Sequence, residues 1–247
     1  AILERTSITA STENFFDHND FWSGSGPFEH ELQIMPSFTF RGGRTLTFMI
    51  RNGYFRFQPE RYANYAILDE DGSQSPFLAP EALKNLKAFM VFPRLRITNK
   101  FSLNGMYIAR ETPIFAEASR GFELQARPEI QWSPTDRLEL SLDHTFSRIS
   151  RSPSKSQAVV LNEIYSTVHI TNIKAQYLFS RALMARMILQ YDLDNREALK
   201  DPTTGQQLAI FGQPQGPRSN GEFQGQFLLQ YEPSPGTIFY IGFSRLM

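Results

Sequence analysis

Apolar and polar residues alternate along ten stretches of the chain, and these stretches form five pairs joined by short turns. In the clearest pair, residues 122–132 and 138–147, apolar side chains occupy every second position on both sides of the turn at 133–136. Successive side chains of a β-strand point to opposite faces of a sheet, so this period of two predicts strands with one apolar and one polar face. The pattern therefore predicts five antiparallel hairpins.

The predicted arms are long compared with the roughly five or six residues typical of strands in soluble proteins. They match the roughly nine to eleven tilted residues that cross the apolar core of a bilayer. The arms are 29–40 and 45–56, 87–98 and 101–111, 122–132 and 138–147, 167–179 and 182–193, and 221–231 and 237–246. Turn lengths predict the register, and the expected facing pairs are Arg127 with Asp143, Gln176 with Arg186, and Arg94 with Asn104.

The connections between the hairpins differ from the short turns within them. Residues 57–85, 148–165 and 194–219 are long and polar, whereas 111–120 is compact. Short turns on one rim and long loops on the other are typical of outer-membrane barrels, while soluble sandwiches distribute loops between both ends. We therefore expect an all-β, antiparallel up-and-down transmembrane β-barrel with about ten visible strands.

Aromatic side chains make up 13% of the chain, with 22 phenylalanines. On the apolar faces they lie beside the short turns and again toward the long loops, with aliphatic residues between them. Aromatic rings favour membrane interfaces, so two aromatic belts around an apolar band are expected, although aromatics also favour strands in general. The predicted lipid-interface aromatics near the short turns are Phe40, Phe101, Trp132, Tyr177, Phe179 and Tyr231.

The polar faces carry charges of both signs, and in a barrel they would line the lumen. Mixed signs predict weak ion selectivity or a wall cross-linked by its own ion pairs, because strong selectivity requires rings of one sign. Charges that merely keep a wet wall solvated are an equally good interpretation. The candidate lumen-lining residues are Arg94, Arg96, Arg127, Glu129, Glu139, Asp143, Lys174 and Arg186.

Three proline segments form a partial repeat on the apolar faces. Pro36, Pro93 and Pro128 each precede a short turn by a few residues. Proline lacks the amide donor of a β-ladder and normally lies at edges or bulges. We therefore expect a bend or bulge at one common level of the sheet.

Composition narrows the function classes. Lys+Arg and Asp+Glu are both 25, so the formal charge of +0 gives no support for a nucleic-acid partner. The chain has no cysteine, which excludes disulfides and thiolate metal sites. Its mean hydropathy of −0.34 is compatible with a barrel, whose inward residues are polar. We predict no cofactor and no metal; Asp69–Gly72 and Asp192–Asn195 lack the spacing of a calcium loop and fit polar turns better.

Catalytic residues are sparse. A lipid hydrolase of the outer membrane would need a histidine and a serine two residues apart on one strand face. His144 has Phe146 at that position, and His169 has Thr171 without an obvious third member. We therefore predict no catalytic residues and no enzymatic activity, with a surface lipid hydrolase as the less favoured alternative.

Two segments, 172–191 and 229–240, resemble the last hairpins of large Gram-negative outer-membrane proteins, whose periplasmic turns read Tyr-x-x-Ser/Pro-x-x-Thr-x-Leu/Phe-Tyr. The closest resemblance is to a C-terminal barrel of unknown function that follows a carbohydrate-binding-like module of the family-9 type. Porins share this turn style. The resemblance covers about the last eighty residues well. It implies fold and location rather than substrate or site residues.

The whole pattern predicts residues 1–27 as the end of an earlier strand, through about residue 10, followed by a surface loop, and 28–247 as barrel hairpins. Both termini are expected at the long-loop side, as in part of a longer barrel. The leading hypothesis is a passive, porin-like conduit in the outer membrane of a Gram-negative bacterium, or a membrane anchor for an associated module. Expected partners are the lipid bilayer and, as further options, other subunits or a periplasmic or surface module. The rival is a soluble, β-rich carbohydrate-binding domain.

Overall fold

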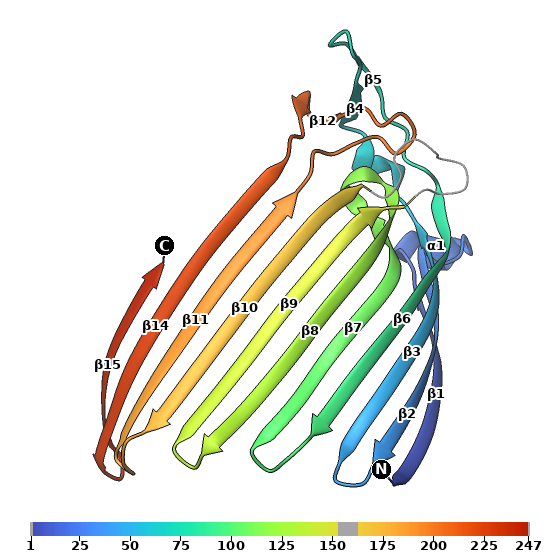
Figure 1. Cartoon of the computed structure of the whole chain (residues 1–247). Coiled ribbons are helices and arrows are strands. Elements are labelled where there is room, and N and C mark those ends of the chain that lie inside the picture. Colours follow the sequence, from blue (N-terminus) through green and yellow to red (C-terminus); the bar gives the residue numbers. More distant parts are fainter. Residues whose placement is uncertain (1, 153–162, 247) are drawn as a thin grey trace.

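One antiparallel β-sheet of 11 strands dominates the computed structural model, which describes residues 2–152 and 163–246 (Figure 1). Each long strand pairs with the next one along the chain, as the alternating pattern predicts. Every neighbouring pair in the sheet is antiparallel, so the topology is up-and-down. In sheet order the strands are β1 (Leu3–Phe15), β2 (Glu29–Phe40), β3 (Arg44–Arg56), β6 (Ala82–Arg96), β7 (Phe101–Ile114), β8 (Ser119–Thr135), β9 (Leu138–Arg151), β10 (Ile164–Leu178), β11 (Leu183–Arg196), β14 (Arg218–Ser234) and β15 (Thr237–Leu246).

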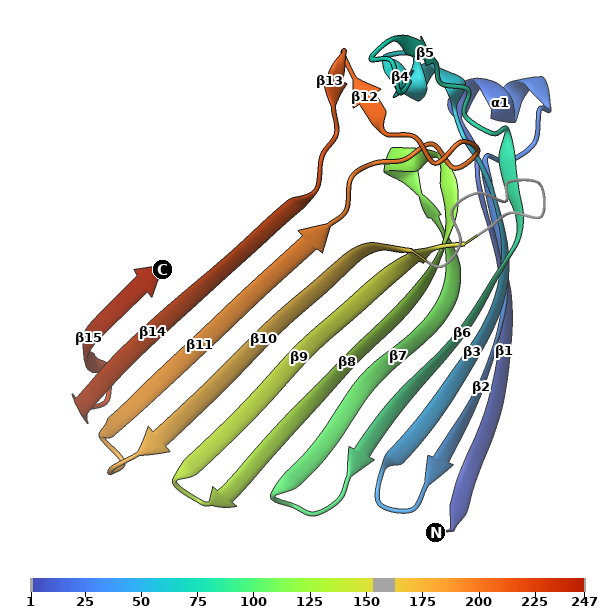
Figure 2. The same ribbon diagram turned by 45° about the horizontal axis from the view of Figure 1, so that its top comes forward.

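The sheet is a single curved layer whose short turns all lie along one rim, here called the short-turn rim; the opposite side is the long-loop rim (Figure 2). At the turn of 41–43, Gly42 and Gly43 adopt φ of 87° and 73°, conformations that favour glycine. β1 and β15 are the two edges, and among the described residues neither pairs with a second strand. The sheet is therefore open, and closure into a barrel stays a prediction.

The first strand differs from the sequence-based expectation. β1 runs as far as Phe15 and pairs with β2 along most of its length, so it is a full strand rather than the tail predicted to end near residue 10. The Arg41 amide donates to the Ile2 carbonyl at 2.9 Å. The N-terminal end of β1 thus lies at the short-turn rim, and the prediction that both termini lie at the long-loop side is wrong for this end.

Two of the three predicted facing pairs are confirmed. Gln176 faces Arg186 and Arg94 faces Asn104. Asp143 does not face Arg127; its β8 partner is Glu129. The error arises at the turn, because β8 continues through residue 135 and the register shifts between Trp132 and Thr135.

The three prolines interrupt the ladders without shifting them. Assigned pairs are missing beside Pro36, Pro93 and Pro128, yet the pairs on either side keep one register. The missing amide donor explains each gap. The expected bulge at this level is therefore wrong, and a local loss of hydrogen bonds replaces it.

A bulge occurs instead near the long-loop rim of β6. The register with β3 shifts opposite residues 53–55, where Asn85 adopts a left-handed φ of 57°. Strict alternation would place Leu83 and Leu86 on opposite faces. Because the bulge inserts a residue, both side chains are buried in one core.

That core lies between the first residues of β6 and a small unit at the long-loop rim. This unit is called the cap and is made of residues 57–81, 115–118 and 197–217. Two segments predicted as polar loops form a four-stranded sheet in the order β13-β12-β4-β5. The cap core contains Phe57, Tyr62, Phe77, Leu83, Leu86, Ala118, Leu199 and Leu208. Its elements are the 3-10 helices η1 (Pro59–Tyr62) and η2 (Phe115–Glu117) and strands β4 (Tyr65–Leu68), β5 (Gln74–Pro76), β12 (Leu208–Ile210) and β13 (Gln213–Pro214). The central part of the predicted loop 148–165 lies outside the described residues.

A short helix, α1 (His18–Ser23), connects β1 to β2 at the long-loop rim (Figure 1). The Phe21 amide donates to the Asp17 carbonyl at 3.0 Å, and Gln58 donates to the Asp17 carboxylate at 2.6 Å. The Trp22 side chain is 75% exposed. No helix among the described residues combines the length and apolar character needed to cross a membrane.

Candidate functional site

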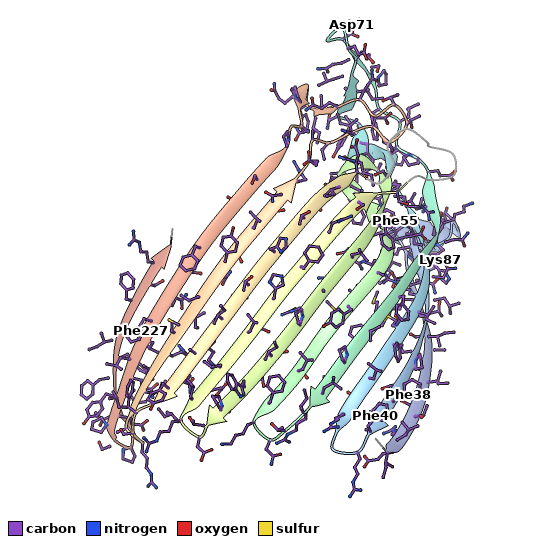
Figure 3. The ribbon with its side chains drawn as sticks, viewed as in Figure 1. Phe38, Phe40, Phe55, Asp71, Lys87 and Phe227 are labelled. Atoms are coloured by element: carbon purple, nitrogen blue, oxygen red, sulfur yellow. The ribbon has the colours of Figure 1, made fainter. Side chains whose placement is uncertain are left out.

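Cross-strand pairing separates the sheet into two chemically different faces. One row of paired residues runs through Phe101, Trp132, Leu140, Ala175, Met187, Phe227 and Phe243. The neighbouring row on the other face runs through Arg96, Ser102, Gln131, Ser141 and Lys174. We call these the apolar face and the wet face. Figure 3 shows side chains projecting from both faces along the whole sheet.

The apolar face is uncovered. Trp132 and Tyr231 are each 47% exposed, and Phe227 is 46% exposed. Phe38 and Phe40 lie toward the short-turn rim, far from Asp71 at the tip of the cap (Figure 3). In the predicted aromatic set, Phe40, Phe101, Trp132, Tyr177 and Tyr231 lie on this face, and Phe179 lies in a turn, 4.8 Å from the Tyr177 ring. Their role at a lipid interface stays a prediction.

All of the predicted lumen-lining residues lie on the wet face. The pairings that place them there join Arg94 to Asn104, Arg96 to Ser102, Glu129 to Asp143, Glu139 to Gln176, Lys174 to Ser141, Arg186 to Gln176 and Met106 to Arg127. Open hollows lie among them. One of them, of about 530 Å³, is lined by side chains from β2 through β8, including Ser37 and Arg127. Only the concave side of a sheet brings such distant strands around one space, so the wet face is concave.

Two arginines on the wet face toward the long-loop rim have carboxylate partners. Arg51 pairs with Glu31 at 2.7 Å, and Arg110 pairs with Glu123 at 2.5 Å. Ser147 also donates to Glu123 at 2.9 Å. These pairs neutralise the charges and join strands that are neighbours in the sheet. This part of the wall is cross-linked by its own ion pairs.

The cations nearer the short turns differ. The side chains of Arg94, Arg96 and Arg127 are exposed on the wet face. No residue in the described ranges forms a hydrogen bond or ion pair with their guanidinium groups. Between β8 and β9, moreover, two carboxylates of like charge, Glu129 and Asp143, face each other. The short-turn half of the wet face thus keeps free charges available to solutes.

Apolar side chains of β6 and β7 also occupy part of the concave face. Ala88, Met90 and Ile108 are buried and pack with Met49, Phe92 and Met106. Two residues along β6 from Ala88, toward the long-loop rim, Leu86 belongs to the cap core instead. The concave face is therefore apolar next to the cap.

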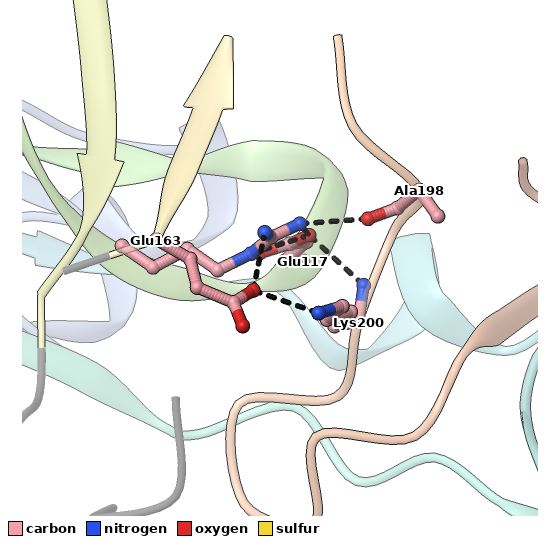
Figure 4. A network of polar contacts seen from close by, with 5 residues as sticks. Glu117, Glu163, Ala198 and Lys200 are labelled. Carbon is pink, nitrogen blue, oxygen red and sulfur yellow. Dashed lines mark hydrogen bonds and ion pairs between the residues drawn. The ribbon is translucent and has the colours of Figure 1, made fainter. Parts of the chain in front are cut away.

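A buried ion pair fixes the cap to the wall (Figure 4). Arg151 donates from Nε to Glu117 at 2.9 Å, and their side chains are 5% and 1% exposed. The Arg151 guanidinium also donates to the Ala198 carbonyl at 2.7 Å. Glu163 accepts from Lys200 Nζ at 2.7 Å and lies 3.4 Å from Arg151 Nη1. Three connections between strands therefore meet at one network.

A buried phenol adds a second link within the cap. Tyr62 donates from its hydroxyl to the Phe115 carbonyl at 2.8 Å. Burial raises the pKa of Tyr62 to about 12, so the hydroxyl keeps its proton and remains a donor at any physiological pH. The carboxylates of Asp69 and Asp71 accept from Ser73 in a tight turn, which is the polar-turn interpretation of this acidic segment.

The histidines do not form a catalytic set. His144 Nδ1 lies 2.9 Å from the Thr171 hydroxyl on the neighbouring strand, and the His144 and His169 rings are 5.7 Å apart. Among the described residues no carboxylate bonds to either ring, and no group of acidic or histidine side chains could hold a metal. Sequence spacing missed the histidine–threonine contact because it lies across two strands rather than along one.

Comparisons with known proteins add little to this geometry. No family model matches the sequence, and no curated protein matches it. Among solved structures the chain is similar to the NanC porin in its rhombohedral crystal form, with a TM-score of 0.30 and 8% identity, over 98% of this chain and 86% of that one. A TM-score this low supports no conclusion about function. The predicted association with a carbohydrate-binding-like module stays a prediction.

Proposed function

We propose that this chain forms the wall of a β-barrel in the outer membrane of a Gram-negative bacterium and serves as a passive conduit for small polar solutes. One observation carries the proposal: a single-layer sheet leaves its apolar face uncovered and turns its wet face inward. Soluble monomers rarely expose contiguous apolar patches beyond a few hundred Å². A bilayer reverses that preference, because lipid covers the outer face and water fills the inside.

The two tryptophans provide a direct test of membrane insertion. A Trp22→Phe variant of the full chain leaves Trp132 as the single tryptophan. We expect vesicles containing brominated phosphatidylcholine to quench Trp132 fluorescence, most strongly with bromines near the headgroups. Release of the protein as a stable soluble monomer without detergent would contradict the proposal and favour the soluble carbohydrate-binding alternative.

Conduction is tested separately by planar-bilayer recording of the reconstituted chain. Stepwise insertion events with ohmic currents are expected for a water-filled lumen. An inserted protein without conductance would exclude the conduit and leave the second role, an anchor for an associated module. A cap at the long-loop rim is compatible with either role, so the recording decides between them.

A further inference from the structure

A second hollow of the wet face lies at the short-turn rim. Its volume is about 380 Å³. No carboxylate of the described residues lines it, so its formal charge is positive. The side chains that matter for its chemistry are Arg94, Arg96, Lys100, Ser102, Asn104 and Gln131.

Two arginines, Arg94 and Arg96, line this hollow. They alternate along β6, so their side chains leave the same face about 7 Å apart along the strand. Toward the long-loop rim of the same face, Arg51 and Arg110 are neutralised by Glu31 and Glu123. Here two guanidinium groups remain without a described partner. Their mutual repulsion is relieved when an anion binds between them.

The surrounding backbone holds both arginines on a rigid support. Arg44 donates from Nε to the Arg96 carbonyl at 3.0 Å and from Nη2 to the Ile97 carbonyl at 3.4 Å, which secures the end of β6. Asn104 and Ser102 face Arg94 and Arg96 across the ladder to β7. Neutral hydrogen-bonding groups thus stand beside each cation, on strands rather than on a loop.

We propose that this hollow is a binding site for an anionic solute with a phosphate or carboxylate group, and that Arg94 and Arg96 bind the anion. A planar guanidinium donates two parallel hydrogen bonds to either group, which gives a strong, charge-assisted contact. Arg94 and Arg96 lie on the face opposite to Trp132, so the ligand reaches them from the lumen rather than from lipid. This inference rests on the proposed function, because the site would bind solutes at the short-turn entrance of the conduit.

The first experiment measures binding without requiring conduction. Inorganic triphosphate is titrated calorimetrically into the full chain in neutral detergent. We expect the Arg94→Gln/Arg96→Gln variant to bind about tenfold or more weakly, since it loses two charge-assisted bonds. A matched control, Lys174→Gln/Arg186→Gln, removes the same charge from the wet face of β10 and β11. Equal losses in both variants, or no binding by the unaltered chain, would overturn the site.

The second experiment separates this inference from the conduit. Triphosphate added at one side of a planar bilayer should block the current, and the β6 variant should need about tenfold more for the same block. Absent conductance with arginine-dependent binding in detergent would remove the conduit but keep the site. Unchanged block in the β6 variant would remove the site but keep the conduit.

A third measurement distinguishes a solute from a lipid headgroup. If vesicles containing anionic phospholipid compete with triphosphate for binding and neutral vesicles do not, the natural ligand is a lipid headgroup, and the proposal of a dissolved anion is wrong.

Discussion

At the scale of single residues, the ion pairs of this protein differ in their expected contribution to stability because their burial differs. The Arg151–Glu117 pair is almost wholly removed from water, whereas Lys100 and Asp136 are 53% and 94% exposed. Removing one partner of a buried pair leaves an uncompensated charge in a low-dielectric site. An exposed pair is screened by water and salt. We therefore expect the buried ion pair to stabilise the cap and the exposed ion pair to contribute little to stability.

An Arg151→Met variant tests this difference. We expect the cap to lose about 3–5 kcal/mol of stability, because Glu117 stays buried without its partner. Lys100→Met should cost no more than about 1 kcal/mol. Hydrogen exchange of the amides in residues 197–217, measured in detergent micelles, reports the opening of the cap. Equal exchange rates in the two variants would contradict a structural role for the buried pair.

The contact between Glu163 and Lys200 predicts a dependence on pH. The hydrogen bond from Lys200 lowers the pKa of Glu163 below its ordinary value of 4.5. A lowered folded-state pKa means that the contact stabilises the cap above pH 4.5 and is lost as the pH falls through the folded-state value. Protection factors of amides near residue 200 should decline in that acidic range. In Glu163→Gln this contribution to the decline should vanish; its persistence would assign the effect to another group.

At the scale of elements, the long strands could be predicted and the cap could not. Period-two alternation over many residues fixes which face of β8 or β9 meets which environment, because the two environments differ along the whole strand. β12 has three residues, too few for any period, and Leu208 is buried only because distant segments surround it. Likewise, the bulge at Asn85 depends on a partner strand. Local pattern determines hairpins, and tertiary packing determines the cap.

The candidate site divides in the same way. Alternation placed Arg94, Arg96 and Arg127 on one face with their neighbours, as found. The lack of a carboxylate partner for Arg127 could not be predicted, because its pairing depends on the register across the turn after Trp132. That register shifts through a β-bulge, and it moved Asp143 from Arg127 to Glu129.

A glycine on β8 lies where side chains of the two neighbouring strands, β7 and β9, approach closely. A Cβ atom at Gly121 would lie 2.8 Å from Ile114 Cγ1 and 3.0 Å from Ile149 Cγ2. Since Ile114 is 2% exposed, it has little room to move. We expect Gly121→Ala to lower the free energy of unfolding in detergent by about 1–3 kcal/mol. At Gly221 the nearest atom would be 3.8 Å away, so Gly221→Ala should be tolerated. Equal tolerance would contradict tight packing at Gly121.

At the scale of the whole molecule, the open edges set a condition on membrane insertion. β1 and β15 both run from the short-turn rim toward the long-loop rim. An antiparallel sheet with an odd number of strands necessarily begins and ends in the same direction, so direct pairing of these two edges would be parallel. Unpaired backbone groups in hydrocarbon cost several kcal/mol each, so a bilayer requires both edges to be covered.

Hydrogen exchange measured in bilayers tests that requirement. We expect amides on the outer edges of β1 and β15 to exchange as slowly as those of the central strand β8. In detergent, where edges reach water, the same amides should exchange faster. Fast exchange at both edges in bilayers would show that the sheet does not close there, whether on itself or with a partner strand.

The cap also has a consequence for the order of folding. Its core unites Phe57, Ala118 and Leu208, which lie far apart in the sequence, whereas each hairpin joins residues that are close together. Closing long loops costs more chain entropy and contacts between distant residues form slowly. We therefore expect hairpins to form early and the cap to assemble only after β11 and β14 are in place. A protease-resistant cap would then be a marker of completed assembly, distinguishing finished molecules from those stalled on the way.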